Sequence, residues 1–492
     1  MRVTKQSPES SLSPPAALRR ALGRLGLLSA LVYLLAFTLP YWLPTYYLGV
    51  KDEIYQFSAR QPWRGILFYL ALAVLLVLYL RAYRLALNLG RGPGGARLVG
   101  AWAALFCLLL IPVYSLTSSD VYGYVFQGRI VAVLGENPFV HLYKDFAADP
   151  FFPIVTFRGL PASTGYGPLW IILDAALGWL ARGRLLLNLF LFKALAATLH
   201  LAGAALVYGL LGRLDPERRV AGTLFYAWNP LLLYELVGNA HNDAALVALA
   251  LLGFYLLIRG RGLAAIAALS AAALVKPVAV LWLPPAALWL VVRTPGWPAR
   301  LRRGAALVGV ALLLAAAAYA PFWQGLDTFR GLLAQSDIHG NSLPNLLIMI
   351  GHWLWPAAGP RVVAGVKLLT ALVFAPFYLW QLATAWRAGT PAGLQRVQFD
   401  VMLFYLLFVG FQFWPWYLAW LLVPAALLPG DLSGARRRLA LILCGLAPLL
   451  YFPFGWQWVR GTSLLLLTAL LAAVPLLGIC AWLLVRAWRA RS

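Results

Sequence analysis

Charged residues are scarce in this sequence, and acidic residues are the scarcest of them. Asp and Glu together number 16 against 40 Lys and Arg, and all charged types make up 11% of the 492 residues. Soluble domains carry about 25% charged residues, whereas 62% of this chain is hydrophobic. This balance excludes an ordinary soluble domain and predicts an all-α protein that crosses a membrane several times.

Cysteine is also rare, and the common nucleotide-binding and nucleophile motifs are missing. Cys107, Cys444 and Cys480 each lie inside an apolar run, which argues against a disulfide framework or a metal cluster. The sequence has no phosphate-binding loop, no Rossmann glycine run and no nucleophile elbow. We therefore expect neither a metal nor another cofactor, and these absences argue against an ATP-driven pump.

The excess of positive charge has a simple explanation in membrane topology. The formal net charge is +24, and most Arg residues lie in short clusters between apolar runs. Cytoplasmic loops of membrane proteins carry such an excess of Lys and Arg. We therefore expect the lipid bilayer as a partner and no nucleic acid.

Fourteen apolar runs are candidates for membrane spans, since a spanning helix needs about 20 residues. They lie at residues 25–45, 63–82, 98–116, 185–212, 219–236, 242–259, 262–276, 277–293, 304–322, 361–386, 398–413, 415–430, 439–454 and 461–485. Two crossings separate each pair of neighbouring basic clusters, so both termini are predicted to be cytoplasmic. Residues 1–24 are predicted as a disordered cytoplasmic tail, and residues 25–492 as one transmembrane domain.

The connections on the opposite side of the membrane carry most of the distinctive polar residues. They lie at 46–62, 117–184, 237–242, Lys276-Pro277, 323–360, 414–416 and 455–460. The longest is 117–184, and its apolar part at 166–181 is predicted as an amphipathic helix on the outer membrane surface. The shared side of these connections predicts a functional site on the outer face of the cell membrane.

Asp120 opens the polar part of segment 117–184. If 118–131 is helical, Asp120, Tyr124 and Gln127 share one helix face, where a carboxylate, a phenol and an amide suit sugar hydroxyls. A carboxylate in apolar surroundings has a raised pKa and can act as a general base. The structural alternative is an acid at a helix start, which the helix dipole favours.

Further polar residues stand at the other outer connections, and each also has a structural interpretation. Glu136 lies in a Gly-Glu-Asn-Pro turn, and His241, Asn242 and Asp243 meet at a tip that an ordinary helix cap also explains. Lys276 precedes a proline and needs an anion such as a lipid phosphate, unless it extends to the interface. His339 lies in a polar loop, and Trp416 in an aromatic tip of the kind found at membrane interfaces.

Several of these residues belong to motifs that follow one another from about residue 100 to 420. The motifs are Ser119-Asp120-Val121-Tyr122 with Tyr124 and Gln127-Gly128, Asn137-Pro138-Phe139, Tyr166-Gly167-Pro168-Leu169, Asn229-Pro230-Leu231, Val237-Gly238, Ala240-His241-Asn242-Asp243, Ala273-Leu274-Val275-Lys276 and Pro415-Trp416-Tyr417-Leu418. In this order they resemble the motifs of bacterial polyprenol-phosphate-mannose-dependent α-(1→6)-mannopyranosyltransferases.

This resemblance implies a GT-C fold and an inverting transfer of mannose from a polyprenyl-phosphate-mannose donor to a glycolipid or glycan acceptor. The general base of the family maps onto Asp120, and the donor phosphate is expected at Lys276 with His241 as a second contact. Family members often carry Arg before the aspartate; Ser119 stands there in this chain, so Arg129 is the candidate charged partner. We expect substrate binding at Tyr122, Tyr124, Gln127, Arg129, Glu136, Tyr166, His241, Asn242, Asp243, Lys276, His339 and Trp416.

Three alternatives remain open at this stage. The enzyme can use another polyprenyl-phosphate sugar with the same equipment. A lipid or sugar-lipid transporter predicts polar residues on both sides of the membrane and tolerance of Asp120→Asn. A non-catalytic membrane scaffold predicts that the same substitution costs no activity.

Overall fold

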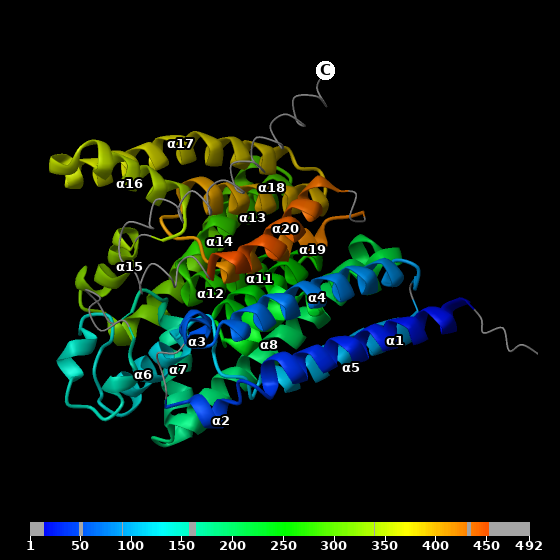
Figure 1. The fold of residues 1–492 in the computed structure, drawn as a ribbon. Coiled ribbons are helices and arrows are strands. Elements are labelled where there is room, and N and C mark those ends of the chain that lie inside the picture. The colour runs from blue at the N-terminus through cyan, green and yellow to red at the C-terminus, as the bar shows by residue number, and fades with distance from the viewer. Residues whose placement is uncertain are drawn as a thin grey trace, which may run out of the picture.

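The computed structural model describes residues 14–48, 53–90, 92–156, 164–338, 340–430 and 434–451, and Figure 1 shows the fold. In these ranges the regular structure is helical, and the β-structure consists of two isolated bridges. The all-α prediction is therefore confirmed. The predicted span at 461–485 and the predicted tail up to residue 13 lie outside the described residues.

The N-terminal half contains twelve α-helices, which are joined by short turns and by the long loop after α6. Their bounds are α1 Pro14–Tyr33, α2 Leu43–Tyr46, α3 Ile54–Arg60, α4 Pro62–Ala86, α5 Pro93–Leu110, α6 Asp120–Ala132, α7 Pro168–Ala181, α8 Leu185–Leu214, α9 Arg219–Ala227, α10 Pro230–Leu232, α11 Asp243–Ile258 and α12 Gly262–Val275. A π-helical turn, η5, continues α10 from Leu233 to Gly238.

The C-terminal half adds eight α-helices as far as residue 451. They are α13 Leu283–Val292, α14 Trp297–Tyr319, α15 Arg330–Ala334, α16 Leu343–Leu354, α17 Gly359–Arg387, α18 Pro391–Phe404, α19 Leu418–Leu427 and α20 Ala435–Leu446. The 3-10 turn η12, Pro415–Tyr417, leads into α19.

Seven helices in the described part of the chain are long and apolar enough to cross a membrane, or up to eight if one bent pair is a single span. The seven are Ala16–Thr38, Pro62–Ala86, Pro93–Leu110, Leu185–Leu214, Trp297–Phe322, Pro356–Arg387 and Pro391–Val409. The prediction of a polytopic membrane protein agrees with this count, but fourteen spans are not confirmed. Pro230 breaks the predicted span 219–236. The predicted spans 242–259, 262–276 and 415–430 form α-helices of only 16, 14 and 10 residues, which are short for a membrane crossing.

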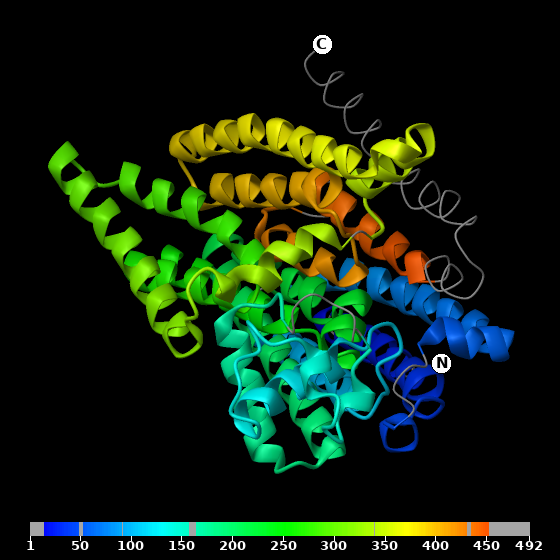
Figure 2. The same ribbon diagram turned by 90° about the vertical axis from the view of Figure 1, so that its left-hand side faces the viewer.

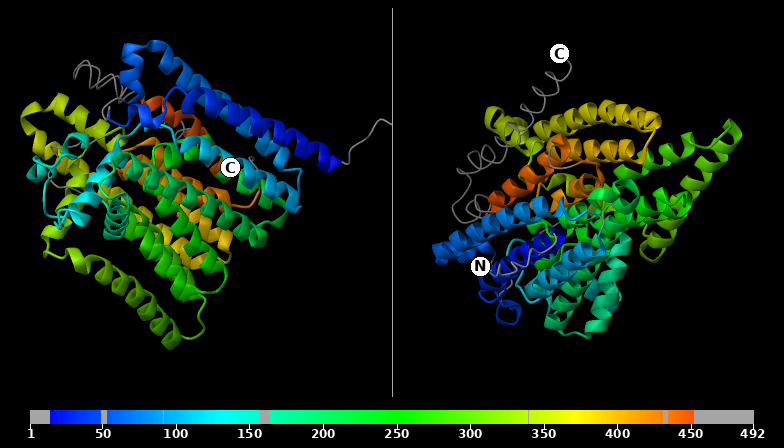
Figure 3. Two further views of the ribbon diagram at one scale, coloured as in Figure 1. Left: turned by 90° about the horizontal axis from the view of Figure 1, so that it is seen from below. Right: turned by 90° about the vertical axis from the view of Figure 1, so that its right-hand side faces the viewer.

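Helices α14 and α17 present apolar side chains to the surroundings of the protein. Leu312 and Leu313 on α14 are 64% and 70% exposed, and Leu372 on α17 is 63% exposed. Figures 2 and 3 show α14 at one edge of the molecule, away from the packed centre. Such surfaces are costly in water and fit contact with lipid.

The elements of segment 117–184 gather at one end of the helix bundle, next to α2, α3 and α15 (Figure 1). Helices α6 and α7 pack closely because two glycines remove side chains from their interface. A Cβ at Gly128 would lie 2.1 Å from the backbone oxygen of Asp174, and one at Gly178 would lie 3.3 Å from the backbone of Gly128. The predicted helices at 118–131 and 166–181 thus appear as α6 and α7, packed on each other.

Candidate active site

Asp120 is the first residue of α6, so its carboxylate lies where the helix meets the preceding turn. Its backbone N–H donates to Ser118 Oγ (3.2 Å), and the Tyr166 hydroxyl donates to Asp120 Oδ2 (3.2 Å). Burial raises the pKa of Asp120, while the positive charge of Lys276 and the hydrogen bonds from Ser118 and Tyr166 oppose that rise. The side chain is still 18% exposed, so a bound molecule can reach it.

A glycine brings Tyr166 to this position. The Gly167 N–H donates to the Val275 carbonyl (3.0 Å), which ties the end of the outer loop to the end of α12. A Cβ at Gly167 would lie 2.0 Å from the Leu274 carbonyl oxygen. The loop can therefore approach α12 this closely only with glycine at position 167, and Tyr166 is held next to Lys276 as a result.

Lys276 follows α12 and is held on two sides. Its Nζ donates to both carboxylate oxygens of Asp243 (2.9 and 3.1 Å) and lies 4.7 Å from the ring centroid of Tyr417 and 5.2 Å from that of Trp420. Asp243 is fully buried and also accepts from the Trp420 indole. Lys276 itself is 12% exposed, so its charge is partnered inside the protein and still accessible from outside.

His241 lies in a sharp break between two helical segments. The chain bends by 118° between the segments Pro230–Gly238 and Asp243–Ile258, and Ala240 in the break has a left-handed backbone with φ 58°. Such a backbone is strained for a residue other than glycine and is typical of functional sites. The His241 side chain is fully buried, stacks on Trp416 with centroids 4.1 Å apart, and places Nδ1 3.6 Å from Asp120 Oδ2.

Glu235 lies behind His241 and is surrounded by hydrogen-bond donors. Its carboxylate accepts from the Tyr451 hydroxyl and from Asn239 Nδ2 (2.9 Å), and the Thr117 hydroxyl lies 3.4 Å away. His241 Nε2 is 3.5 Å from Glu235 Oε2, and the Glu235 side chain is 1% exposed. An imidazole thus stands between two carboxylates, one accessible and one buried.

Sequence reasoning missed Glu235, although a signal was present. Glu235 is the acid in the apolar run 219–236, and an acid inside an apolar span is usually functional. The same signal applies to Lys193 in the run 185–212, whose buried ammonium donates to the Gly238 carbonyl next to the break.

Glu53 is a second missed acid near Asp120. It precedes α3, and Ser119 lies beside its carboxyl group. Burial and the nearby charge of Asp120 raise the pKa of Glu53 to about 7. Two acidic side chains, Asp120 and Glu53, therefore lie close to the start of α6.

Two further predicted residues complete the immediate surroundings of Asp120. The Tyr124 ring packs edge-on against Tyr166 (5.3 Å between centroids) and against Trp170 (5.1 Å). Asn242 is fully buried, and within the described residues its side-chain oxygen and nitrogen have no hydrogen-bond partner. Tyr124 therefore packs against the Tyr166 ring and supports it. The Asn242 amide lies inside the cluster and is available to form hydrogen bonds.

The other predicted site residues lie apart from this cluster. Gln127 Nε2 donates to the Tyr143 hydroxyl (2.6 Å), and the Tyr122 hydroxyl donates to the Tyr47 carbonyl (3.2 Å). Glu136 is half-exposed and lies 3.1 Å from His141 in the loop after α6. His339 lies outside the described residues.

Arg129 requires a correction, because it is not the charged partner of Asp120. It pairs with Asp149 (2.9 Å) and covers the Phe151 ring (4.6 Å from the centroid). Nine residues along an α-helix amount to two and a half turns, so Arg129 points to the opposite side of α6 from Asp120. The cation that acts on Asp120 is Lys276.

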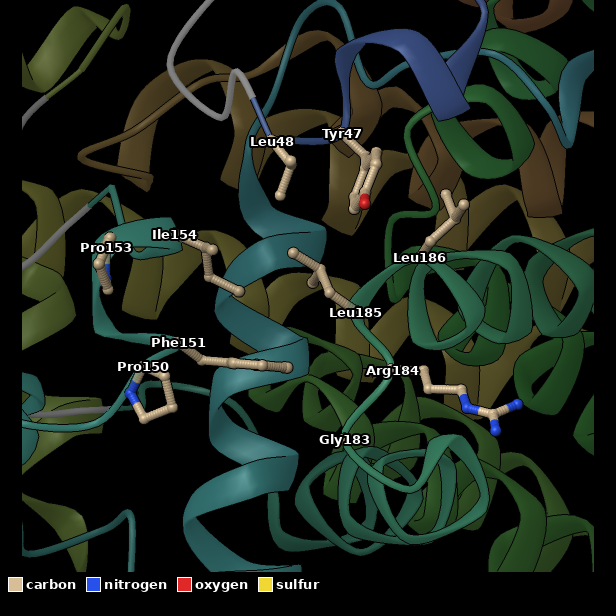
Figure 4. A pocket seen from close by; sticks show the side chains of 10 residues that line it. All are labelled: Tyr47, Leu48, Pro150, Phe151, Pro153, Ile154, Gly183, Arg184, Leu185 and Leu186. Atoms are coloured by element: carbon tan, nitrogen blue, oxygen red, sulfur yellow. The ribbon is translucent and has the colours of Figure 1, made fainter.

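A cavity of about 600 Å³ opens beside the outer loop, and Figure 4 shows its lining. The lining residues are Tyr47, Leu48, Pro150, Phe151, Pro153, Ile154, Gly183, Arg184, Leu185 and Leu186. The cavity is mainly apolar, and none of the residues around Asp120 described above lines it. We therefore place the candidate active site at Asp120 and not in this cavity.

In the ranges that the structure describes, no group of three or more His, Cys, Asp or Glu side chains is arranged to hold a metal ion. Asp120, Asp243 and Glu235 are instead engaged by Tyr166, Lys276, Trp420, Tyr451 and Asn239.

Comparison with known proteins gives two matches. The family model described as "Alpha-(1->6)-mannopyranosyltransferase, N-terminal domain" matches residues 23–293, which is more than half of the chain. The curated protein "Alpha-(1->6)-mannopyranosyltransferase A" of Mycobacterium tuberculosis is 26% identical over 360 residues. That match covers 68% of this chain and 64% of the relative's own length. The matched residues 23–293 include Asp120, Tyr166, His241 and Lys276, and this chain belongs to the alpha-(1->6)-mannopyranosyltransferase family.

Proposed function

We propose that this protein is a membrane glycosyltransferase that moves mannose from a polyprenyl-phosphate-mannose donor to a hydroxyl of a glycolipid or glycan acceptor. Asp120 is the general base, and Lys276 stabilises the phosphate that leaves. Family membership supports the mannosyl transfer, and the geometry around Asp120 supports the division of roles.

The observation that carries the proposal is the unequal exposure of the charged side chains in the cluster. Asp120 is 18% exposed and Lys276 is 12% exposed, whereas the buried acids Asp243 and Glu235 are 0% and 1% exposed. A substrate at this surface therefore meets the Lys276 ammonium and the Asp120 carboxylate, beside which the partly exposed Glu53 lies. These are the two groups that a transfer from a phosphate donor needs, namely a base for the acceptor and a cation for the leaving group.

The chemistry at these two groups balances without a further reactant. The Asp120 carboxylate takes the proton of the acceptor hydroxyl while the hydroxyl oxygen forms a bond to C1 of mannose. The bond between C1 and the phosphate oxygen breaks, and its electron pair leaves with the polyprenyl phosphate. Lys276 faces this developing charge, and its contact with Asp243 keeps the ammonium in place.

The same exposure supports inversion at C1. A retaining mechanism of the double-displacement type needs a second carboxylate that reaches the sugar as a nucleophile. Asp243 is held by Lys276 and Trp420, and Glu235 lies behind His241. Glu53 lies beside Asp120, but its pKa is raised to about 7, and a carboxyl group that keeps its proton is a poor nucleophile. An inverting enzyme that forms an α linkage must start from a β-linked donor.

The arrangement in the membrane is part of the proposal. In this proposal the basic clusters and both termini are on the cytoplasmic side, and Asp120 faces the outer side. The membrane domain has a GT-C architecture. The grouping of α6, α7 and the long loop at one end of the bundle supports a site on one face of the membrane (Figure 1), and the apolar exposure of α14 and α17 supports their contact with lipid.

A donor panel tests the reaction. Membranes that contain the protein are given polyprenyl-phosphate-[¹⁴C]mannose or the corresponding glucose and arabinose donors, and matched membranes without the protein serve as the control. We expect transfer from the mannose donor alone, and we expect an α linkage when the product is analysed by NMR spectroscopy. Transfer from another donor and not from mannose, or a β-linked product, would contradict the proposal.

A further inference from the structure

Glu235 and His241 form a polar arrangement that the proposed reaction has not yet used. His241 Nδ1 is 3.6 Å from Asp120 Oδ2, and His241 Nε2 is 3.5 Å from Glu235 Oε2. Among the described residues neither ring nitrogen has a hydrogen-bond partner, so these two carboxylates are the groups that face the ring edges. Both distances slightly exceed a hydrogen bond, as is common for catalytic contacts before substrate binds.

The neighbours of Glu235 all present hydrogen-bond donors to its carboxyl group. The Asn239 amide donates to Oε2, the Tyr451 hydroxyl reaches Oε1, and Thr117 lies within 3.5 Å of both oxygens. The Asn239 amide also donates to Thr117 Oγ1 (2.6 Å), which directs the Thr117 hydroxyl hydrogen toward the carboxylate. Because these neighbours direct their hydrogens toward Glu235, its oxygens act as acceptors. The nitrogen facing them, His241 Nε2, therefore carries the hydrogen.

The other ring nitrogen then has a defined role. A neutral imidazole with hydrogen on Nε2 has an unprotonated Nδ1, and that lone pair points at Asp120. It accepts a hydrogen bond from Asp120 only after Asp120 has taken a proton. The contact is therefore stronger once the acceptor hydroxyl has been deprotonated, which is the condition for an interaction that accelerates the step.

Packing holds the ring in this orientation. Trp416 stacks on one face with centroids 4.1 Å apart and interplanar angle 20°. Lys193 donates to the Gly238 carbonyl, and the left-handed Ala240 turns the chain between that carbonyl and His241. The buried ring can therefore neither turn toward water nor exchange its two nitrogens freely.

We propose that Glu235 is a positioning residue that fixes the tautomer of His241, so that the His241 ring supports the protonated form of Asp120 during transfer. The inference rests on the proposed role of Asp120 as the base. Glu235 and His241 act through Asp120 and do not themselves touch the sugar.

The tautomer can be measured without an activity assay. The chain contains five histidines, so ¹⁵N-histidine labelling of the full protein in lipid, with His241→Gln as the assignment control, isolates the His241 signals by solid-state NMR. We expect protonated Nε2 and unprotonated Nδ1 in the wild type, and a mixture of tautomers in Glu235→Gln. A wild-type ring with hydrogen on Nδ1, or an unchanged ring in Glu235→Gln, would overturn the proposal.

A double-mutant cycle tests the effect on transfer. Residues that orient a reacting group typically matter by about 10- to 100-fold, and we expect this loss in kcat for Glu235→Gln and for His241→Gln, with donor KM within about twofold. The double variant should be no slower than His241→Gln, because Glu235 acts through the ring. Glu235→Asp should recover part of the rate, since it keeps a carboxylate.

Asp174→Asn is the matched control, because Asp174 is a fully buried carboxyl outside the cluster, and we expect its kcat to stay within about twofold of wild type. Losses that multiply in the double variant would assign Glu235 a structural role and overturn the proposal. Absence of mannose transfer by the wild type would refute the proposed function, while the NMR result would still decide the tautomer.

Discussion

The Tyr166 hydroxyl donates to Asp120 Oδ2 at 3.2 Å, although 46 residues separate them in the chain. This bond joins the start of α6 to the turn before α7, since Asp120 begins α6 and Tyr166 lies two residues before Pro168, the first residue of α7. It stabilises the ionised form of Asp120 against the effect of burial. The bond therefore influences the pH at which Asp120 can act as a base.

Tyr166→Phe tests this bond through the pH dependence of transfer. The loss of the hydroxyl removes a group that lowers the pKa of Asp120, so that pKa rises. Because the ionised carboxylate is the active form, the acidic limb of kcat against pH should move to higher pH. The measurement is a pH series of mannose transfer, with Tyr319→Phe as the control. An acidic limb that stays in place would show that Asp120 does not control it.

Lys276→Met should shift the same limb further and also weaken the donor step. Lys276 is the strongest of the groups that lower the pKa of Asp120, and its ammonium is the proposed contact for the leaving phosphate. We expect kcat at neutral pH to fall by about 100-fold or more, as for loss of one electrostatic stabiliser of a transition state. Lys144→Met, which removes an exposed lysine of the outer loop, is the control. A donor KM and kcat close to wild type would remove Lys276 from the mechanism.

Gly128→Ala should destabilise the protein, whereas Gly123→Ala should not. A Cβ at Gly128 would lie 2.1 Å from the Asp174 carbonyl oxygen, whereas a Cβ at Gly123 would lie 3.8 Å from the Tyr143 hydroxyl. Overpacking of a close interface costs about 1–3 kcal/mol, and alanine inside a helix is favoured over glycine by about 0.5–1 kcal/mol. Thermal unfolding in detergent compares the two variants. Equal melting temperatures would contradict the close packing of α6 on α7.

Asp174→Asn should stabilise the protein increasingly as the pH rises. Burial raises the pKa of Asp174 well above its ordinary value, and neither carboxylate oxygen has a hydrogen-bond partner in the ranges described. Above the pKa of the unfolded chain, about 3.9, the folded protein keeps a proton that the unfolded chain has lost. The Asp174 contribution to stability therefore falls as the pH rises.

The measurement for Asp174 is the melting temperature of wild type and Asp174→Asn from pH 5 to 8. The gap between them should widen in favour of the variant, because all other titrating groups are common to both proteins. A gap that is constant, or that narrows with pH, would show that Asp174 is ionised in the folded state.

Much of the local structure around the site could be predicted from the sequence. The helix from Asp120 and the helix after Gly167-Pro168 follow from helix start signals and appear as α6 and α7. Contacts between side chains from distant segments could not be predicted. Hydropathy indicates which segments lie in the membrane, but it does not indicate which segments pack against each other. Arg129 was paired wrongly for this reason, since Asp149 lies in a loop with no periodic pattern.

Buried polar residues inside apolar runs were also missed in the prediction from sequence. Glu235 and Lys193 sit inside long apolar runs, and a reading based on span length treats such runs as uniform. Their partners are Asn239 and Tyr451 for Glu235, and the Gly238 carbonyl for Lys193. These contacts depend on the break between α10 and α11, whose angle no sequence pattern specifies.

The most direct test of the account is mannose transfer by Asp120→Asn. Membranes with wild type, Asp120→Asn or Asp145→Asn receive polyprenyl-phosphate-[¹⁴C]mannose, with protein amount and folding matched by detergent chromatography. Asp145 is an exposed acid of the same outer loop and serves as the control. Loss of a general base costs about 100- to 10,000-fold, so we expect that fall in Asp120→Asn alone. Equal transfer by wild type and Asp120→Asn would contradict the assignment of Asp120 as the base.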